Sequence, residues 1–261
     1  MNKSVEGNGK ILVVSDLHVG SKVSIMPDEV NLGEAERKNT IRSNPLQKFI
    51  YKQWEHMVDS VGKVDACIVL GDSVEGSNRK SKGSGLWTPD ISDQVSVASS
   101  LLSMVKTTKY VGVQGSFYHV EDNTSSDKAV IDALGGTFGD ELVVNSGKTR
   151  IHCSHAVGVS SSATAYRPTP IAREMMLATI NKEEYGKYDL ILRGHAHYYV
   201  EVRFGSSKGV ICPCWKGRDE YVARKTLAFL PHLGYLLIKG NEVYPYVFTL
   251  KQGMNVPEVH I

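Results

Sequence analysis

Short apolar runs recur along the first three quarters of the chain, and each run stops abruptly at a polar residue or a glycine. Residues 10–15, for example, are rich in isoleucine and valine and end directly before Asp16. Continuous runs of this kind are typical of strands that are covered on both faces. The pattern predicts buried strands at 10–15, 64–70, 110–113, 149–154 and 190–192.

Apolar residues with helical spacing lie between these runs. The spacing predicts helices at 45–61, 91–105, 127–134 and 171–185. Asp90 and Thr169 are expected to begin two of these helices, because each is next to a proline and carries a side-chain oxygen for capping. Alternating strands and helices imply parallel crossovers, with helices outside a largely buried sheet. The sequence therefore predicts an α/β fold.

The pattern changes after Tyr198. We expect further strands, separated by turns, at 199–204, 209–212, 234–238 and 242–250. These strands predict a more antiparallel sheet in the second half of the chain. No repeat or linker-like stretch divides the sequence, which predicts one continuous domain over residues 1–261. Residues 20–44 form an unusually long connection and are expected to be a lid or an insertion.

The amino-acid composition excludes some classes of function but does not identify a single one. Hydrophobic residues make up 41% of the chain and charged residues 22%, which is typical of a globular protein. Thirty basic and 28 acidic residues leave a formal net charge of +2, which argues against a nucleic-acid coat. No apolar run approaches the roughly 20 residues of a membrane span. The first ten residues lack the apolar stretch of a secretory signal, so we expect a cytoplasmic protein with no membrane partner.

The four cysteines do not form a disulfide framework in a chain of this length. Cys67 and Cys153 lie in apolar runs that predict buried strands. Cys212 and Cys214 are two residues apart, a separation that does not suit a disulfide. A zinc site on that pair would need two further ligands nearby, and none is evident. We expect four reduced cysteines.

Metal-ligating residue types follow nearly every predicted strand. In chain order they are Asp16, His18, Asp72, His119, His155, His195 and His197. The carboxyl ends of strands in an α/β sheet meet at one rim, so these side chains are expected to converge. A single histidine or aspartate at such a position is more often structural, but the whole set favours a metal site. Aspartate oxygens with imidazole nitrogens suit manganese, iron or zinc.

The number of candidate ligands exceeds what one ion takes, and the Asp72 carboxylate can bridge two. Two ions roughly 3.5–4 Å apart clamp a phosphoryl oxygen and convert a bridging water into hydroxide at neutral pH. We therefore expect two divalent ions, with manganese first and iron, zinc, nickel or magnesium as alternatives.

The order of these motifs resembles that of the calcineurin-like metallophosphoesterases. The signature of that family runs Asp-x-His, Gly-Asp, Gly-Asn-His, a lone His and Gly-His-x-His. The chain has Asp16-Leu17-His18, Gly71-Asp72, Gly115-Ser-Phe-Tyr-His119, His155 and Gly194-His195-Ala-His197 in the same order. The resemblance implies a four-layer α/β/β/α sandwich of two mixed sheets with a dinuclear metal site.

The resemblance also implies a role for each matching residue. Asp16, His18 and His197 would hold the first ion, His155 and His195 the second, with Asp72 bridging the two. His119 matches the family's Gly-Asn-His histidine, which donates a proton to the leaving oxygen or steadies the transition state.

Two departures from the family pattern stand out. The asparagine ligand is absent before His119, and either the hydroxyl of Ser116 or a water would take its place. Similar Gly-Ser/Thr-x-x-His versions occur in phage- and prophage-like members, which would place the protein in a bacterial or phage-infected cell. Asp72 is followed by Ser-Val-Glu-Gly instead of the Asp-Arg-Gly of the protein Ser/Thr phosphatases, which argues against a phosphoprotein phosphatase.

Three residues near the motifs are candidates for contacts with the substrate. Arg79, in a basic loop after Asp72, and Arg193, directly before Gly194, would grip a phosphate. Tyr118 would stack on a base. Exposure to solvent or local packing is the alternative for each.

The leading hypothesis is a phosphoesterase for phosphodiester or phosphomonoester bonds of a phosphorylated small molecule, a nucleotide or nucleic acid. One alternative is a DNA exonuclease or endonuclease of the same fold. The other is a catalytically silent binding scaffold of the kind that some relatives form in sorting complexes. The sequence leaves the oligomeric state open.

Overall fold

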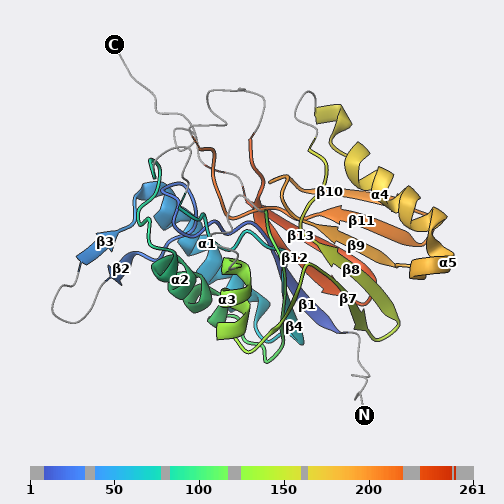
Figure 1. Cartoon of the computed structure of the whole chain (residues 1–261), viewed down its shortest axis with the longest axis horizontal. Helices are drawn as coiled ribbons and strands as arrows, with labels where there is room; N and C mark the ends of the chain where they lie inside the picture. The colour runs from blue at the N-terminus through green and yellow to red at the C-terminus, as the bar shows by residue number, and fades with distance from the viewer. Residues whose placement is uncertain are drawn as a thin grey trace.

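The computed structural model describes residues 9–32, 39–77, 83–116, 125–159, 164–219, 230–248 and 250. Its larger sheet has six strands in the order β13-β12-β1-β4-β5-β6 (Figure 1). These strands are β13 (Glu242–Phe248), β12 (Leu233–Lys239), β1 (Lys10–Val14), β4 (Ala66–Val69), β5 (Tyr110–Val113) and β6 (Thr137–Gly139). The last four are parallel, whereas β12 is antiparallel to both β1 and β13. The sheet is therefore mixed.

The second sheet has five strands in the order β10-β11-β9-β8-β7. They are β10 (Val200–Phe204), β11 (Ser207–Ile211), β9 (Leu190–Arg193), β8 (Thr149–Ser154) and β7 (Glu141–Ser146). The three central strands are parallel, and an antiparallel strand closes each edge. This sheet is mixed as well.

Side-chain capping defines where the first three helices begin. α1 (Pro45–Val61) starts at Asn44, whose side chain and that of Gln47 form a capping box. The carboxylate of Asp90 caps α2 (Ile91–Ser103), as the sequence predicts. The hydroxyl of Ser125 caps α3 (Ser126–Ala133). On the other side of the molecule, α4 (Thr169–Ile180) and the short α5 (Lys182–Tyr185) follow the 3-10 turn Thr164–Tyr166.

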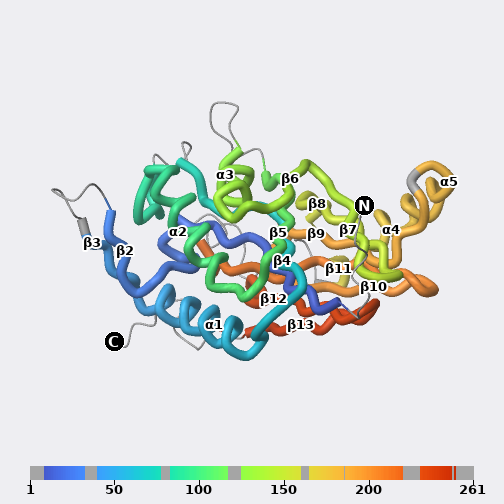
Figure 2. Tube along the Cα trace, turned by 90° about the horizontal axis from the view of Figure 1, so that it is seen from below, coloured from blue at the N-terminus to red at the C-terminus, as the bar shows by residue number. Residues whose placement is uncertain are grey.

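Three hydrophobic clusters separate four layers. In β1, Leu12 packs toward α1 and α2, whereas Ile11 and Val13 pack toward the other sheet. In β9, Ile191 packs against α4, and its two neighbours along the strand pack between the sheets. Figures 1 and 2 show α1, α2 and α3 on one side of the sheets and α4 on the other. The α/β/β/α sandwich of two mixed sheets is thus confirmed.

Residues 20–44 contain a small antiparallel ribbon of β2 (Glu29–Leu32) and β3 (Asn39–Arg42). The ribbon projects from the side of the molecule that carries α1 and α2 (Figures 1 and 2). Its function as a lid stays a prediction, as does the single-domain organisation of residues 1–261.

The strand pairing corrects one expectation about the second half of the chain. β12 and β13 do not join a separate antiparallel sheet but extend the larger sheet beside β1. The predicted helix 171–185 is divided at Asn181 into α4 and α5. The short strands β2, β3, β6 and β7 were absent from the sequence prediction.

All four cysteines are buried and free. Among the described residues, the structure contains no helix that is long and apolar enough to cross a bilayer.

The core between the two sheets gives a direct test of this packing. Ile68 is fully buried there, so Ile68→Ala removes contacts with both sheets and leaves a cavity. We expect the free energy of unfolding to fall by about 2–5 kcal/mol in urea denaturation. Val143→Ala on β7, where the side chain is 40% exposed, serves as the control and should change it by less than about 0.5 kcal/mol. Equal effects of the two changes would contradict the inter-sheet core.

Candidate metal centre

Each candidate ligand in the described part of the chain lies in a loop that follows a strand. The loops carry Asp16 and His18 after β1, Asp72 after β4, Ser116 after β5, His155 after β8, and His195 and His197 after β9. Backbone hydrogen bonds join these loops: His18 N donates to Asp72 O at 2.9 Å, and Gly194 N donates to His155 O at 3.0 Å. The carboxyl ends of strands from both sheets therefore meet at one rim, as expected for an α/β site.

The first group of side chains consists of Asp16, His18 and His197, whose ligand atoms lie within 4.8 Å of one another. Nε2 of His197 lies 3.1 Å from Nε2 of His18 and 3.2 Å from Oδ1 of Asp16. The other oxygen of Asp16 accepts hydrogen bonds from the Ser15 hydroxyl at 2.5 Å and from His195 N at 3.0 Å. These bonds fix the carboxylate and direct its Oδ1 toward the two imidazoles.

The second group consists of Asp72, His155 and His195, also with ligand atoms within 4.8 Å. Oδ2 of Asp72 lies 3.1 Å from Nε2 of His155 and 3.8 Å from Nε2 of His18, so this carboxylate faces both groups. The Ser116 hydroxyl lies 2.8 Å from Oδ2 of Asp72 and 3.3 Å from a nitrogen of each histidine in the second group. Ser116 is thus within reach of the second group, and its role as a ligand stays a prediction.

The backbone at these residues adopts an uncommon conformation. Among the described residues, five non-glycine residues have a positive φ: Asp16, His18, Asp72, His195 and His197, with values from 49° to 66°. All five are candidate ligands. Left-handed backbone at non-glycine residues costs roughly 1–3 kcal/mol each and gathers at functional sites. This coincidence indicates that the five side chains are held in place for a purpose other than packing.

Two glycines allow the loops to approach each other closely. A Cβ atom at Gly115 would lie 2.2 Å from Oδ1 of Asp72, and one at Gly194 would lie 2.2 Å from the hydroxyl oxygen of Ser15. Neither position has room for a side chain. The glycines that open Gly115-Ser116 and Gly194-His195 therefore have a steric basis in this chain.

Asp127, in the first turn of α3, holds two of the loops together. Its buried carboxylate accepts hydrogen bonds from Ser73 N at 2.8 Å and from Gly115 N at 2.9 Å. Burial raises the pKa of this carboxyl group, and the negative charge of Asp72 adds to the increase. Asp127 thus fixes the distance between the loop that carries Asp72 and the loop that carries Ser116.

A chain of buried charges lies behind His18. Nδ1 of His18 is 2.8 Å from Oε2 of Glu75, whose two carboxylate oxygens accept hydrogen bonds from Nζ of Lys216 at 3.1 and 3.0 Å. Lys216 also pairs with Asp219 at 3.2 Å. The carboxylate of Glu75 favours a proton on Nδ1, which leaves the lone pair of Nε2 on the side of Asp16 and His197. This tautomer is the one that a metal ligand needs.

Burial keeps His18 neutral. It lowers the pKa of His18, and the positive charge of Lys216 lowers it further; the attraction of Glu75 offsets only part of this, and the resulting pKa is about 4. A neutral imidazole is the form that binds a metal.

Neighbouring opposite charges shift the pKa values of His155 and Asp16. Burial lowers the pKa of His155, but the negative charge of Asp72 outweighs it and raises the pKa to about 10. Burial raises the pKa of Asp16, but His197 and His155 outweigh it and hold the pKa below its usual range. Nδ1 of His155 donates to the carbonyl of Leu70 at 2.6 Å, which turns Nε2 toward Asp72. A metal would therefore displace a proton from His155.

The residues present fit two divalent cations. Oδ1 of Asp16 is buried and has no well-directed hydrogen bond within the described part of the chain. The Nε2 atoms of His18 and His197 lie 3.1 Å apart, and Nε2 of His197 lies 3.2 Å from Oδ1 of Asp16, so all three ligand atoms converge on one point. Carboxylate oxygens combined with imidazole nitrogens suit manganese, iron or zinc. The structure therefore has two adjacent candidate metal-binding sites.

Arg193 is the one described site residue that does not join the two groups. Its Nε forms an ion pair with Oε2 of Glu174 in α4 at 2.6 Å, and one guanidinium nitrogen lies 3.0 Å from Nδ1 of His152. Arg193 lies two residues from Ile191 in β9 and therefore shares its α4-facing side of the sheet. These contacts favour a structural role, and a contact with substrate stays a prediction.

The other three predicted site residues, His119, Tyr118 and Arg79, lie outside the described residues. Sequence reasoning missed Glu75, Lys216 and Asp127 as members of the site. Glu75 had a local signal, because it follows Asp72 by three residues; Asp127 and Lys216 had none.

No protein-family model and no curated protein sequence matches the chain. Among solved structures, Vps29 from Chaetomium thermophilum is 15% identical, with a TM-score of 0.50 over 94% of this chain and 92% of that one. Vps29 complexed with zinc from Entamoeba histolytica is 14% identical, with a TM-score of 0.47 over 91% and 92%. An archaeal phosphodiesterase is 12% identical, with a TM-score of 0.47 over 92% and 99%. Identities this low concern the fold alone.

The similarity to the Chaetomium protein and the four-layer arrangement described above support the same fold. The chain has the calcineurin-like metallophosphoesterase fold.

The buried carboxylate behind His18 generates a prediction about metal binding. Glu75→Gln keeps the shape of the side chain but removes the charge that holds the proton on Nδ1 of His18. We expect the affinity for Mn²⁺ at the first group to fall about 10–100-fold in calorimetric titration of the metal-free protein. Glu55→Gln, an exposed change on α1, is the matched control and should leave the affinity unchanged. An unaltered affinity in Glu75→Gln would show that Glu75 does not position His18.

Proposed function

We propose that the chain is a phosphoesterase that holds two divalent ions and hydrolyses phosphodiester or phosphomonoester bonds. The observation that carries the proposal is the pair of three-residue groups, Asp16-His18-His197 and Asp72-His155-His195, with the Asp72 carboxylate facing both. The left-handed backbone at five of these six residues supports it, because such strain persists mainly at functional sites.

In this proposal each group holds one ion, and Asp72 contributes to both. Two bound ions would polarise a phosphoryl oxygen and lower the pKa of a water molecule to near neutrality. The protein itself contributes orientation: Glu75 fixes the ring of His18, and the Leu70 carbonyl fixes the ring of His155. The Ser116 hydroxyl would supply the oxygen ligand that asparagine provides in the family. Manganese is the ion that we expect first, given the mixed oxygen and nitrogen donors.

His119 would donate the proton that the leaving oxygen needs. An imidazole titrates near neutral pH and is therefore suited to this step. The assignment rests on the match of His119 to the family's Gly-Asn-His motif.

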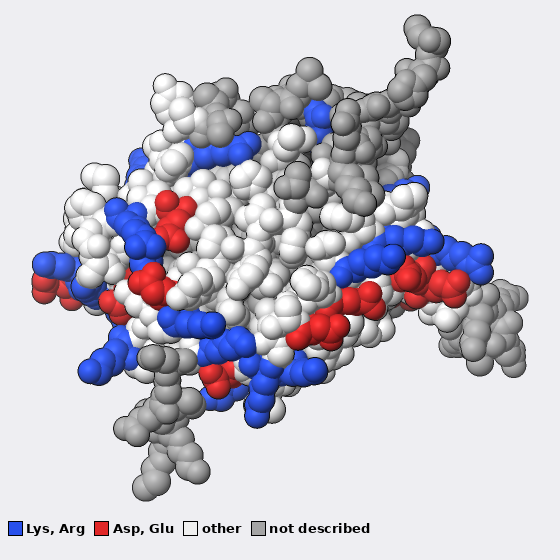
Figure 3. All heavy atoms as spheres, turned by 180° about the vertical axis from the view of Figure 1, so that it is seen from behind, with Lys and Arg blue, Asp and Glu red and all other residues white. Residues whose placement is uncertain are grey.

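The substrate class that we propose is a nucleotide or a short nucleic-acid strand. On the face drawn in Figure 3, basic and acidic side chains of the described residues alternate around a broad uncharged centre. Together with a net charge of +2, this pattern does not favour a long electrostatic contact between this face and duplex DNA. The resemblance to a phage-like branch is compatible with such substrates and remains part of the proposal.

A silent binding scaffold is the alternative from another class. All six residues of the two groups are present and brought together, and a scaffold has no need to retain strained ligands. The enzyme is therefore the function that the geometry favours.

Asp72→Asn is the sharpest test of the two-ion proposal. The change keeps the size of the side chain but removes the charge that faces both groups. We expect hydrolysis of a chromogenic phosphodiester in Mn²⁺ to slow by more than about a hundredfold, with the far-UV circular dichroism spectrum unchanged.

Asp140→Asn, a surface change between β6 and β7, is the matched control. Wild-type turnover in Asp72→Asn would discard the two-ion scheme. A panel of mononucleotides, cyclic nucleotides, and single- and double-stranded DNA, assayed under the same conditions, separates the nucleotide substrate from the nuclease alternative.

His119→Ala distinguishes a proton donor from a ligand. If His119 donates the proton to the leaving oxygen, its loss should slow hydrolysis by about 10²–10⁴-fold. Metal analysis by inductively coupled plasma mass spectrometry should still find two ions per chain. A substrate with a better leaving group, such as a nitrophenyl ester, should be affected less. Loss of bound metal in this variant would make His119 a ligand instead.

A further inference from the structure

Lys216 is a buried lysine behind the first group of candidate ligands. Its side chain is 7% exposed, and Nζ lies 3.1 and 3.0 Å from the two carboxylate oxygens of Glu75 and 3.2 Å from Asp219. Burial lowers the pKa of Lys216, but the charges of Glu75 and Asp219 outweigh it and raise the pKa, so the lysine is charged. A buried ion pair seldom stabilises a fold more than apolar packing does. The pair therefore points to a role other than stability.

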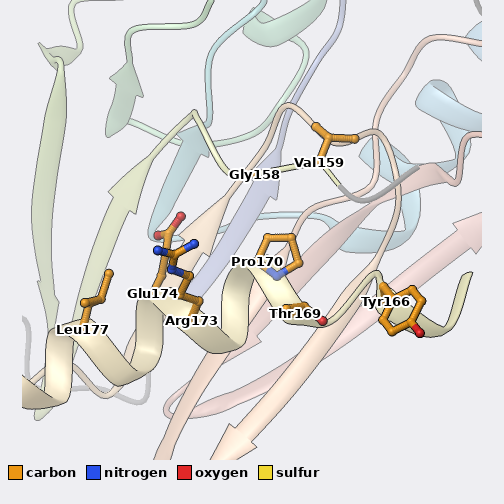
Figure 4. A pocket seen from close by; sticks show the side chains of 8 residues that line it. All are labelled: Gly158, Val159, Tyr166, Thr169, Pro170, Arg173, Glu174 and Leu177. Carbon is orange, nitrogen blue, oxygen red and sulfur yellow. The ribbon is translucent and has the colours of Figure 1, made fainter. Parts of the chain in front are cut away.

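Two other buried cations pair with carboxylates that solvent reaches. Lys208 pairs with Glu242 at 2.7 Å, and the Glu242 side chain is 56% exposed. Arg193 pairs with Glu174, which lines a hollow of about 550 Å³ beside α4 (Figure 4). Glu75, by contrast, is 7% exposed, like its lysine partner. Both charges of the pair behind the metal centre are thus withdrawn from water.

The backbone that carries Lys216 is bonded to the loop of the first ligands. Trp215 N donates to the carbonyl of Asp16 at 3.0 Å, and Gly217 N donates to the carbonyl of Val23 at 2.7 Å. The side chain of Trp215 is fully buried. Lys216 is therefore held at a fixed place relative to Asp16, on the inner side of the site.

We propose that Lys216 is a positioning residue for the first ion and that it acts through Glu75. Its ammonium group donates to both carboxylate oxygens of Glu75, which leaves that carboxylate a single orientation. In this orientation Oε2 of Glu75 lies 2.8 Å from Nδ1 of His18. The contacts from Lys216 to His18 thus turn the imidazole so that its Nε2 faces the ion.

The second group orients its histidine in a different way. Nδ1 of His155 donates to the carbonyl of Leu70, directly after β4, at 2.6 Å. That carbonyl belongs to the backbone and needs no side chain to hold it. The loss of the charge of Lys216 should therefore weaken the ion at the first group and leave the ion at the second group in place.

Calorimetric titration of the metal-free chain with Mn²⁺ measures this effect. Lys216→Met keeps most of the length of the side chain and removes its charge. We expect the affinity for one of the two ions to fall about tenfold, the lower end for a group behind a metal ligand.

Lys208→Met is the matched control, because it removes an equally buried lysine charge. Lys208 lies at the start of β11, whereas the candidate ligands follow the ends of the strands. Both affinities should stay within about twofold of the wild type. An unchanged affinity in Lys216→Met, or an equal loss in Lys208→Met, would overturn the proposal.

The Glu75→Gln background tests whether Lys216 acts through Glu75. Two residues that act through one contact have non-additive effects. When Lys216→Met is added to Glu75→Gln, the affinity for Mn²⁺ should therefore change by less than about twofold. A tenfold loss in both backgrounds would show that Lys216 acts by another route.

Asp219→Asn is a milder variant for the case in which Lys216→Met does not fold. The Asp219 side chain is 31% exposed, and its charge is the second partner of Lys216. We expect the affinity for one ion to fall about two- to fivefold, as for the loss of a partly exposed ion pair. Wild-type affinity in a folded Asp219→Asn would count against the proposal in the same way.

The inference rests on the proposed function, because it concerns one of the two proposed ions. Nitrogen NMR of the histidine rings in the metal-free chain separates the two, with His18→Gln to identify the resonances of His18. We expect the tautomer with its proton on Nδ1 in the wild type and a mixture of both tautomers in Lys216→Met.

The outcomes of the titration and the NMR experiment distinguish the two proposals. A wild type that binds two ions, with the wild-type tautomer and affinity in Lys216→Met, would overturn the role of Lys216 and leave the proposed function intact. A wild type that binds no ion would overturn both.

Discussion

The candidate site depends on a strained backbone at the strand ends. Asp16, His18, Asp72, His195 and His197 all adopt left-handed backbone, which places their side chains at one rim. At roughly 1–3 kcal/mol each, five such residues together cost about as much as the 5–15 kcal/mol net stability of a typical domain. The rest of the fold must therefore hold them, and the inter-sheet core, the close approach at Gly115 and Gly194, and the bonds to Asp127 do so.

The charges of the site give a chemical reason for the strained backbone at these residues. Two buried carboxylates and four imidazoles within a few ångströms are a poor arrangement for a packed core, because burial disfavours charge. The same arrangement is favourable when divalent cations supply the positive charge. The outer residues agree with this interpretation: Glu75 and the Leu70 carbonyl each hold a proton on the far nitrogen of a histidine, so that the near nitrogen is free to bind.

The sequence allowed much of the fold and the six grouped residues to be predicted, because both follow from local patterns. Apolar runs define the buried strands, and ligand types directly after them converge at the carboxyl ends. The pairing of β12 with β1 had no such signal, since the two strands are more than 200 residues apart and local pattern does not encode the partner. Lys216 was missed for the same reason: it meets Glu75 across 141 residues.

The side of the sheet on which Arg193 lies could have been predicted from the alternation of side chains along the strand. Arg193 alternates with Leu192 in β9 and therefore shares the side of Ile191, which faces α4. Strand alternation alone would have placed its side chain away from the other candidates. Glu75 also had a sequence signal, because it lies three residues after Asp72. Its contact with His18, however, depends on the geometry of the loops that carry Glu75 and His18.

Anomalous diffraction from crystals grown with Mn²⁺ would locate the bound ions. We expect two anomalous peaks per chain, roughly 3.5–4 Å apart. One should lie among Asp16, His18 and His197, and the other beside His155 and His195, with a carboxylate oxygen of Asp72 within bonding distance of both. A single peak, no peak, or peaks remote from these residues would contradict the dinuclear site.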